Sequence, residues 1–196
     1  MRLISLCVLI LLLAACGSGG GSSSAPAAPG TGSGGGSSGG GSGAPTQTWQ
    51  QEMLASVNGH RTNGVTAGGT THPPVGALTW NDLLAQAAER YARDMHDNNA
   101  WDHVGSDGST VSQRVSDTGY AWGSAGENIA KGQTSVTQVM DAWINSSGHR
   151  ANIMSSNYTQ VGFARVGNSW VQVFGRPLSG VSQRIAPVEV VVARID

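Results

Sequence analysis

Two residues with complementary chemistry flank one predicted helix in the middle of the chain. Glu127 lies in a short extended run before the helix, and His149 lies just after it. Ser135 is a favourable N-cap with Gln138 at capping-box spacing, and apolar residues follow at three- and four-residue intervals. Gly148 can adopt the left-handed conformation that ends many helices, so we expect a turn to deliver His149. The pattern predicts a carboxylate and an imidazole that face each other.

The rest of the sequence excludes several common catalytic centres. It contains neither a His-Glu-x-x-His motif nor a Gly-x-Ser-x-Gly motif. The two cysteines, Cys7 and Cys16, lie near the amino terminus, so the part expected to fold has no thiolate and no disulfide. His103 precedes a glycine-rich turn and is well placed to point into a cleft, although a histidine in such a turn is more often a surface residue.

Residues 1–45 are not expected to fold with the rest. Residues 1–16 combine Arg2, an apolar run shorter than the ~20 residues of a membrane-spanning helix, and a final Leu-Ala-Ala-Cys. This end is similar to the lipobox of bacterial lipoproteins, which predicts a lipid on Cys16; an ordinary signal peptide is the alternative. Residues 17–45 are almost wholly small and uncharged, which predicts a disordered tether. Gly17 is not the aspartate associated with inner-membrane retention, so the outer membrane is expected in a cell with two membranes.

Residues 46–196 are long enough for one domain. Apolar periodicity predicts helices over 46–61, 81–98 and 110–117 besides the central one, with a loop over 62–74 and a short extended piece over 75–78. Strands are predicted over 160–166 and 169–174, around the turn dipeptide Gly167-Asn168, and over 187–195. This order predicts an α+β fold with helices packed on a small, mainly antiparallel sheet.

The charge of the chain bears on its possible partners. The formal net charge is −1 and there is no basic run, so nucleic acid is not an expected partner.

Polar residues at the ends of the predicted helices have structural interpretations. We interpret Asn58 and Arg61, at the end of the first helix, as capping and solvent-contacting residues. His60 is interpreted as an exposed helix-end histidine, and His96 as a cation that favours the carboxyl end of its helix.

Short motifs spread over residues 53–175 resemble those of the CAP superfamily, which unites cysteine-rich secretory proteins, antigen 5 and pathogenesis-related 1 through a shared SCP domain. The chain is most similar to the bacterial, cysteine-free branch. The matching residues are, in chain order, Met53-Leu54, Asn58, Arg61, Leu78, Trp80, Ala88, Tyr91-Ala92, His103, Asp107-Gly108-Ser109-Thr110, Arg114, Gly119-Tyr120, Gly126-Glu127-Asn128-Ile129-Ala130, Trp143, Ser146, Gly148-His149-Arg150, Asn152-Ile153-Met154, Val161-Gly162, Trp170, Gln172 and Phe174-Gly175. The resemblance covers nearly the whole domain and implies an α-β-α sandwich.

The resemblance also implies a set of site residues. The family carries a cleft with two histidines and two acidic residues, and by motif His103, His149 and Glu127 match three of them. The second acid would fall at Ser146, and this departure weakens any mechanism that needs two carboxylates. The candidate binding residues are therefore His103, Glu127, His149 and Ser146, with Glu127 as the candidate for a catalytic role.

Three chemical roles are open to this set. Two neutral imidazoles and a carboxylate make a plausible weak site for Zn²⁺ or another divalent cation, with His103 and His149 as possible ligands. A Glu–His pair could instead act as a general base. The third role is structural, a hydrogen-bonded network that holds helix ends to the sheet.

These roles correspond to three functional hypotheses. The first is a membrane-tethered, extracytoplasmic binding module of the bacterial cell envelope that holds a lipid, a wall component or a partner protein. The second is a metal-assisted hydrolase that acts on envelope peptides or glycans. The third is a structural lipoprotein with a vestigial cleft. The missing second acid and the lack of a nucleophile motif favour the binding module and make an enzyme the less favoured hypothesis.

Overall fold

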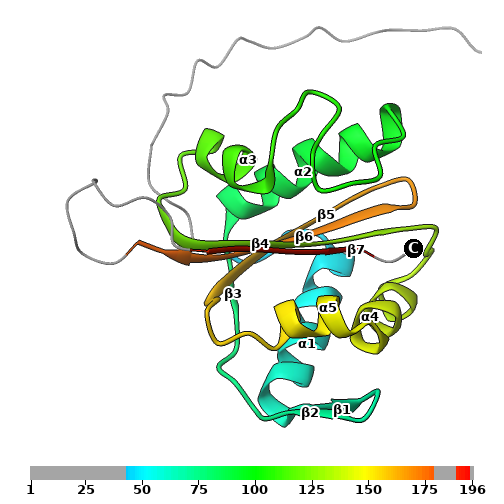
Figure 1. Cartoon of the computed structure of the whole chain (residues 1–196), viewed down its shortest axis with the longest axis vertical. Coiled ribbons are helices and arrows are strands. Elements are labelled where there is room, and N and C mark those ends of the chain that lie inside the picture. Colours follow the sequence, from blue (N-terminus) through cyan, green and yellow to red (C-terminus); the bar gives the residue numbers. More distant parts are fainter. Residues whose placement is uncertain (1–42, 179–188, 195–196) are drawn as a thin grey trace, which may run out of the picture. The chain divides into compact units, whose positions relative to one another are not determined.

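The computed structural model describes residues 43–178 and the backbone of residues 189–194 (Figure 1). The helices are α1 (Thr48–Asn63), α2 (Asp82–Asp97), α3 (Val111–Asp117), α4 (Val136–Asn145) and α5 (Ser147–Ile153). The strands are β1 (Val65–Ala67), β2 (Thr70–His72), β3 (Thr79–Trp80), β4 (Trp122–Lys131), β5 (Gln160–Val166), β6 (Ser169–Pro177) and β7 (Glu189–Arg194). The signal predicted over residues 1–16, and most of the tether predicted over residues 17–45, lie outside the described residues.

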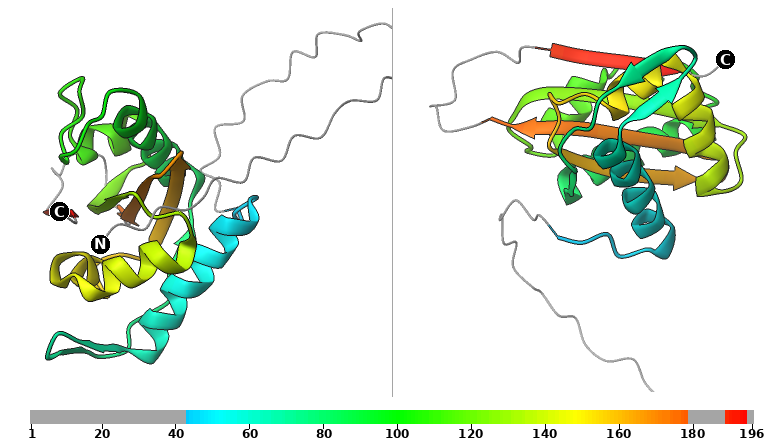
Figure 2. Two further views of the ribbon diagram at one scale, coloured as in Figure 1. Left: turned by 90° about the vertical axis from the view of Figure 1, so that its right-hand side faces the viewer. Right: turned by 90° about the horizontal axis from the view of Figure 1, so that it is seen from below.

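Five of the strands form one sheet in the order β3-β5-β6-β4-β7. The central pairs β5–β6 and β4–β6 are antiparallel, whereas β3–β5 and β4–β7 pair in parallel at the two edges. Helices α2 and α3 cover one face, and α1, α4 and α5 cover the other (Figure 1), a layering that Figure 2 shows from two further sides. The predicted α+β class and α-β-α sandwich are confirmed.

Each face of the sheet has its own hydrophobic core, and β6 contributes to both. Trp170 and Phe174 belong to the core on the side of α1 and α4. Val171 and Val173 belong to the core on the side of α2 and α3. Successive side chains of a strand point to opposite faces, so a strand between two helical layers is apolar at nearly every position.

Side-chain caps fix where two of the helices begin. Asn81 Oδ1 accepts hydrogen bonds from the backbone nitrogens of Leu83 and Leu84, at 2.9 and 3.2 Å. Ser135 Oγ accepts one from the Gln138 nitrogen at 3.2 Å, as its position predicts. The Gln138 carboxamide oxygen accepts instead from the Thr134 nitrogen, at 2.8 Å, so its return contact falls one residue earlier than a capping box requires. In the described residues, no helix combines the length and the apolarity needed to cross a bilayer.

The loop predicted over residues 62–74 contains a small hairpin, so that prediction was wrong. Strands β1 and β2 pair antiparallel, with Ala67 opposite Thr70. The turn between them is Gly68-Gly69, with φ of 57° and 75°, which glycine adopts without steric cost. The glycine–threonine composition concealed a two-residue hairpin signal. The extended piece predicted over 75–78 also lies later, because β3 is Thr79–Trp80.

The polar end of α1 is a packing element rather than the solvent-contacting end that was predicted. Asn58 donates to the Leu78 carbonyl at 2.9 Å and accepts from the Leu78 nitrogen at 2.8 Å. Arg61 is 1% exposed and donates to the carbonyls of Gly76 and Ile153, at 2.7 and 2.6 Å. Burial lowers the pKa of Arg61 to about 10. The two side chains bind the segments around β3 and after α5 to the first helix.

His149 was predicted to follow a turn, but it lies within helix α5. Ser146 separates α4 from α5 in an extended conformation, with φ −89° and ψ 125°. Gly148 is the second residue of α5 and is not among the described glycines with a positive φ. The sequence does not distinguish a helix interrupted at one residue from a helix that ends in a turn, because small polar residues are common at both.

Gly162 lies where β5 passes very close to α2. A Cβ atom at this position would lie 2.1 Å from the backbone nitrogen of Ala85. We expect Gly162→Ala to lower the free energy of unfolding by at least about 1–3 kcal/mol, the usual cost of overpacking, as measured by urea denaturation. Gly123→Ala on β4 is the control, because its Cβ would meet its nearest atom at 3.8 Å, an ordinary contact. Equal losses in the two variants would contradict the close approach of α2 to β5.

Candidate functional site

Glu127 lies in the middle of β4, with a fully buried side chain. Because side chains alternate along a strand, Glu127 and its neighbour Asn128 reach opposite faces of the sheet. The Glu127 carboxylate bonds to Arg114 of α3, whereas the Asn128 carboxamide bonds to the backbone of His149 in α5. The candidate carboxylate and the candidate helix α5 therefore belong to different layers of the sandwich.

Both carboxylate oxygens of Glu127 are engaged. Oε1 lies 2.9 Å from His103 Nδ1, and Oε2 accepts a hydrogen bond from Arg114 Nη2 at 2.8 Å. The side chains of Arg114 and Glu127 are 1% and 0% exposed, so they form a buried ion pair. His103, at 13%, is the most exposed member of this set. We call His103, Arg114 and Glu127 the Glu127 network.

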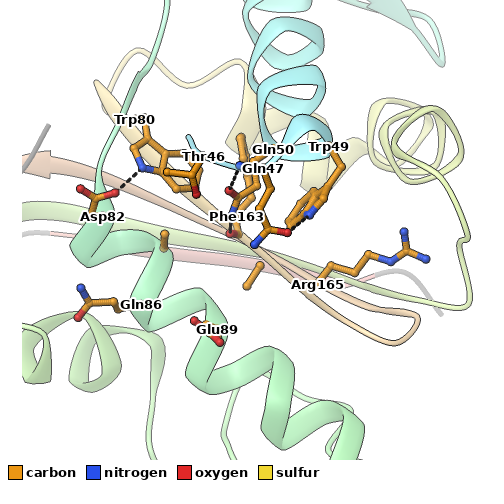
Figure 3. Close-up of a pocket in the computed structure, with 12 residues that line it drawn as sticks. Thr46, Gln47, Trp49, Gln50, Trp80, Asp82, Gln86, Glu89, Phe163 and Arg165 are labelled. Carbon is orange, nitrogen blue, oxygen red and sulfur yellow. Dashed lines mark hydrogen bonds between the residues drawn. The ribbon is translucent and has the colours of Figure 1, made fainter. Parts of the chain in front are cut away.

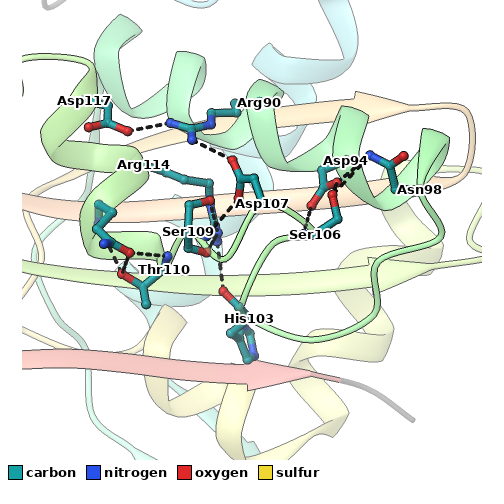
Figure 4. Close-up of polar contacts among 11 residues, drawn as sticks. Arg90, Asp94, Asn98, His103, Ser106, Asp107, Ser109, Thr110, Arg114 and Asp117 are labelled. Atoms are coloured by element: carbon teal, nitrogen blue, oxygen red, sulfur yellow. Dashed lines mark hydrogen bonds and ion pairs between the residues drawn. The ribbon is translucent and has the colours of Figure 1, made fainter.

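Arg114 connects this network to α2 and to the loop before α3. Its guanidinium donates to the carbonyl of Ser109 at 2.6 Å and to that of His103 at 3.2 Å (Figure 4). It also lies 3.9 Å from the ring centroid of Tyr91, a cation–π contact. Burial, reinforced by the negative charge of Glu127, raises the pKa of Tyr91 to about 12. Tyr91 is thus a neutral aromatic partner for the guanidinium.

A second, exposed set of ion pairs holds the same loop from outside. Arg90 of α2 donates to Asp107 at 2.8 Å and to Asp117 at 2.6 Å (Figure 4). Hydrogen bonds from Ser109 and Arg90 lower the pKa of Asp107 well below its ordinary value. The loop that carries His103 is therefore fixed by a buried pair on one side and by exposed pairs on the other.

His149 forms the other polar contact of the predicted set. Its ring is fully buried, with Nδ1 at 2.7 Å from Ser146 Oγ. The ring stacks on Trp143 of α4, with centroids 6.5 Å apart and planes 25° apart. The structure therefore pairs His103 with Glu127 and His149 with Ser146, in two separate contacts.

The residues present do not fit a metal centre with three protein ligands. Among the residues that the structure describes, no group of three or more His, Cys, Asp or Glu side chains is placed to hold an ion. Glu127 is the only carboxylate of the predicted set, and both of its oxygens are bonded, one of them to the cationic Arg114. His103 alone has the surroundings of a metal ligand, with a carboxylate on Nδ1 and a buried Nε2 that has no hydrogen-bond partner in the described chain.

Arg114, Asn128 and Asn152 were not predicted as site residues, although all three belong to the motifs quoted above. Asn152 donates to the Asn128 carboxamide oxygen at 2.9 Å and to the Glu127 carbonyl at 3.2 Å. One sequence signal for Arg114 was available. It lies three residues after Val111, on the face that buries that short helix, where an arginine requires a buried acidic partner.

The five-stranded sheet with helices on both faces agrees with the α-β-α sandwich that the sequence motifs implied. The family model described as the cysteine-rich secretory protein family, CAP, matches residues 54–174. This match covers more than half of the chain, and the chain therefore belongs to that family, as its motifs predicted.

Two curated relatives match part of the chain. It is 38% identical over 99 residues to the uncharacterized protein YkwD of Bacillus subtilis (strain 168) and 32% identical over 85 residues to the uncharacterized membrane protein YlbC of the same organism. These matches cover 50% and 43% of this chain but 38% and 25% of the relatives. The chain thus spans less than half the length of either relative.

Two solved structures have similar folds. One is an extracellular protein containing a SCP domain from Bacillus anthracis str. Ames, with 26% identity, a TM-score of 0.58, and coverage of 65% of this chain and 40% of that one. The other is an outer surface protein from Borrelia burgdorferi, with 20% identity, a TM-score of 0.58, and coverage of 68% of this chain and 96% of that one. The second likeness shows the fold alone.

Removing the cation of the buried ion pair should be far more costly than removing an exposed one. We expect Arg114→Met to lower the free energy of unfolding by about 3–5 kcal/mol, because it leaves the Glu127 carboxylate buried without its partner. Arg90→Met is the matched control, since its pairs with Asp107 and Asp117 are exposed and worth less than about 1 kcal/mol each. Urea denaturation compares the two variants, and similar losses would show that the Glu127 network does not support the fold.

Proposed function

We propose that the chain is a CAP-domain binding module held outside the cytoplasm, in which His103, oriented by Glu127, contacts the ligand. The observation that carries this proposal is the environment of Glu127, whose carboxylate is fully buried with both oxygens bonded. A general base must lie within hydrogen-bond reach of the proton that it removes. Glu127 holds the His103 ring in one orientation, and because both of its oxygens are already bonded, neither is free to remove a proton from a substrate.

The proposed location rests on the sequence and on the relatives. Residues 1–16 have the pattern of a lipoprotein signal, with Cys16 as the lipid acceptor. One solved relative is described as extracellular, and one curated relative as a membrane protein. In this proposal the lipid on Cys16 and the tether over residues 17–45 hold the domain at the bacterial envelope, on the outer membrane of a cell that has two.

The proposed ligand is an envelope component or a lipid with a polar group. His103 Nε2 is buried and has no hydrogen-bond partner among the described residues. Such an atom favours a site that a polar ligand or a water completes. With Nδ1 donating to the Glu127 carboxylate, a neutral His103 presents Nε2 as a hydrogen-bond acceptor, which suits a hydroxyl or amide group of an uncharged ligand.

The alternative function is a metal-assisted hydrolase of envelope peptides or glycans, and a zinc titration separates it from a binding module. It would need Zn²⁺ or another divalent cation on His103 and His149. Because the described residues supply no third ligand, we expect calorimetry on the purified full-length chain to detect no micromolar Zn²⁺ binding at fixed pH. Micromolar binding that disappears in the His103→Ala, His149→Ala double variant would establish the metal site and favour the hydrolase.

The role of His103 can be tested on whole envelopes. We expect the full-length chain carrying Cys16→Ser, which removes the predicted lipid, to be retained on washed bacterial envelopes. Adding His103→Ala should reduce the retained fraction at least fivefold with the melting temperature changed by only a few degrees. His60→Ala at the end of α1 is the matched control. Extracting the envelopes with organic solvent distinguishes a lipid from a wall component, and unchanged retention of His103→Ala would overturn the proposal.

A further inference from the structure

A pocket of about 500 Å³ lies at the edge of the sheet where β3 and β5 pair. The amino-terminal end of α1 forms one wall, the first turns of α2 form the opposite wall, and β5 forms the floor (Figure 3). Strand β6 separates β5 from β4, so the pocket is distinct from the Glu127 network. Its volume is within the range of small-molecule sites, about 300–1,000 Å³.

The α1 wall offers a rigid aromatic surface. Trp49 is partly exposed, and its indole Nε1 donates to Gln47 Oε1 at 2.6 Å. The ring also packs edge to face on Trp170, with centroids 5.6 Å apart and planes 87° apart. Two independent contacts thus fix the orientation of the indole before any ligand binds. A fixed flat ring suits the apolar face of a cyclic ligand at low entropic cost.

The α2 wall offers polar groups instead. Gln86 is exposed and lines the pocket, so its carboxamide can reach a ligand there. Glu89 lies one turn further along, with Oε1 bonded to Arg93 at 2.5 Å. Figure 3 shows both side chains across the pocket from the Trp49 wall. A carboxamide supplies donors and an acceptor together, and a carboxylate supplies acceptors, which is the set that vicinal hydroxyl groups require.

The charges around the pocket restrict the ligand further. Asp82 and Glu89 are its acidic residues and Arg165 is its basic residue. Because Arg93 pairs with Glu89 and Arg165 is the one basic residue among the described residues of the lining, these residues offer no cluster of cations to bind a strongly anionic ligand. Most of the lining side chains are polar, which disfavours an acyl chain. A ligand with one apolar face and many uncharged hydroxyl groups agrees with both walls.

We propose that this pocket binds a neutral saccharide, with a sugar ring stacked on Trp49 and its hydroxyl groups bonded to Gln86 and Glu89. The site is separate from the binding function proposed for His103 and does not depend on it. The amide group of an N-acetylated sugar adds a donor and an acceptor that the polar residues of the pocket can match. An N-acetylglucosamine oligomer is therefore the first probe, and a cello-oligosaccharide shows whether the acetamido group matters.

The test is a titration of the purified full-length chain with N,N′,N″-triacetylchitotriose and with cellotriose, followed by tryptophan fluorescence and calorimetry. We expect saturable binding of at least one of them, weakened at least tenfold by Trp49→Ala and at least threefold by Gln86→Ala. Gln86→Ala removes an exposed side chain and keeps the test valid if Trp49→Ala disturbs packing. Glu52→Ala, also exposed on α1 but outside the pocket, should bind like the unmodified chain.

His103→Ala separates this proposal from the previous one. It should leave saccharide affinity unchanged, so either proposal can fail without the other. Absence of binding for both trisaccharides at millimolar concentration would overturn the saccharide site. Equal affinity of Gln86→Ala and the unmodified chain would overturn it as well, because the contact would then lie elsewhere.

Discussion

The ion pair between Arg114 and Glu127 is the constraint on which the rest of the site depends. Moving two charges out of water costs several kcal/mol each, and only close geometry with further hydrogen bonds offsets this cost. The chain provides that geometry from three elements, because α3 supplies Arg114, β4 supplies Glu127, and the preceding loop supplies the carbonyls of Ser109 and His103. The position of His103 therefore follows from the hydrogen bonds that the buried Arg114 guanidinium makes to the His103 carbonyl and to Glu127.

Much of the fold could be predicted, because the spacing of apolar residues and the residues that cap helices or form turns can be recognised within short segments of sequence. Asn81, Ser135 and the dipeptide at Gly167 specify two helix starts and a hairpin in terms of single residues. The pairing partners could not be predicted in the same way. Nothing in the sequence of β7 indicates that it pairs in parallel with β4, since a strand's alternation does not identify its neighbour.

The site was predicted less completely than the fold, for a physical reason. The motifs identify His103, Glu127, His149 and Ser146, and the structure joins them as two pairs. Which pairs form depends on the faces to which neighbouring side chains point, and that depends on the layers that cover each face. The burial of Arg114 likewise cannot be predicted without the position of the Glu127 carboxylate in the fold, although the two residues lie only 13 positions apart in the chain.

The placement of β7 has a consequence for the order in which the domain can be completed. A chain emerges from its amino-terminal end during synthesis, and β4 appears long before β7. Until β7 arrives, the outer edge of the strand that holds Glu127 presents unpaired amide and carbonyl groups to any extended segment nearby. Until residues 189–194 are synthesised, β4 is therefore an unpaired edge strand, and such edges are prone to pair with other chains.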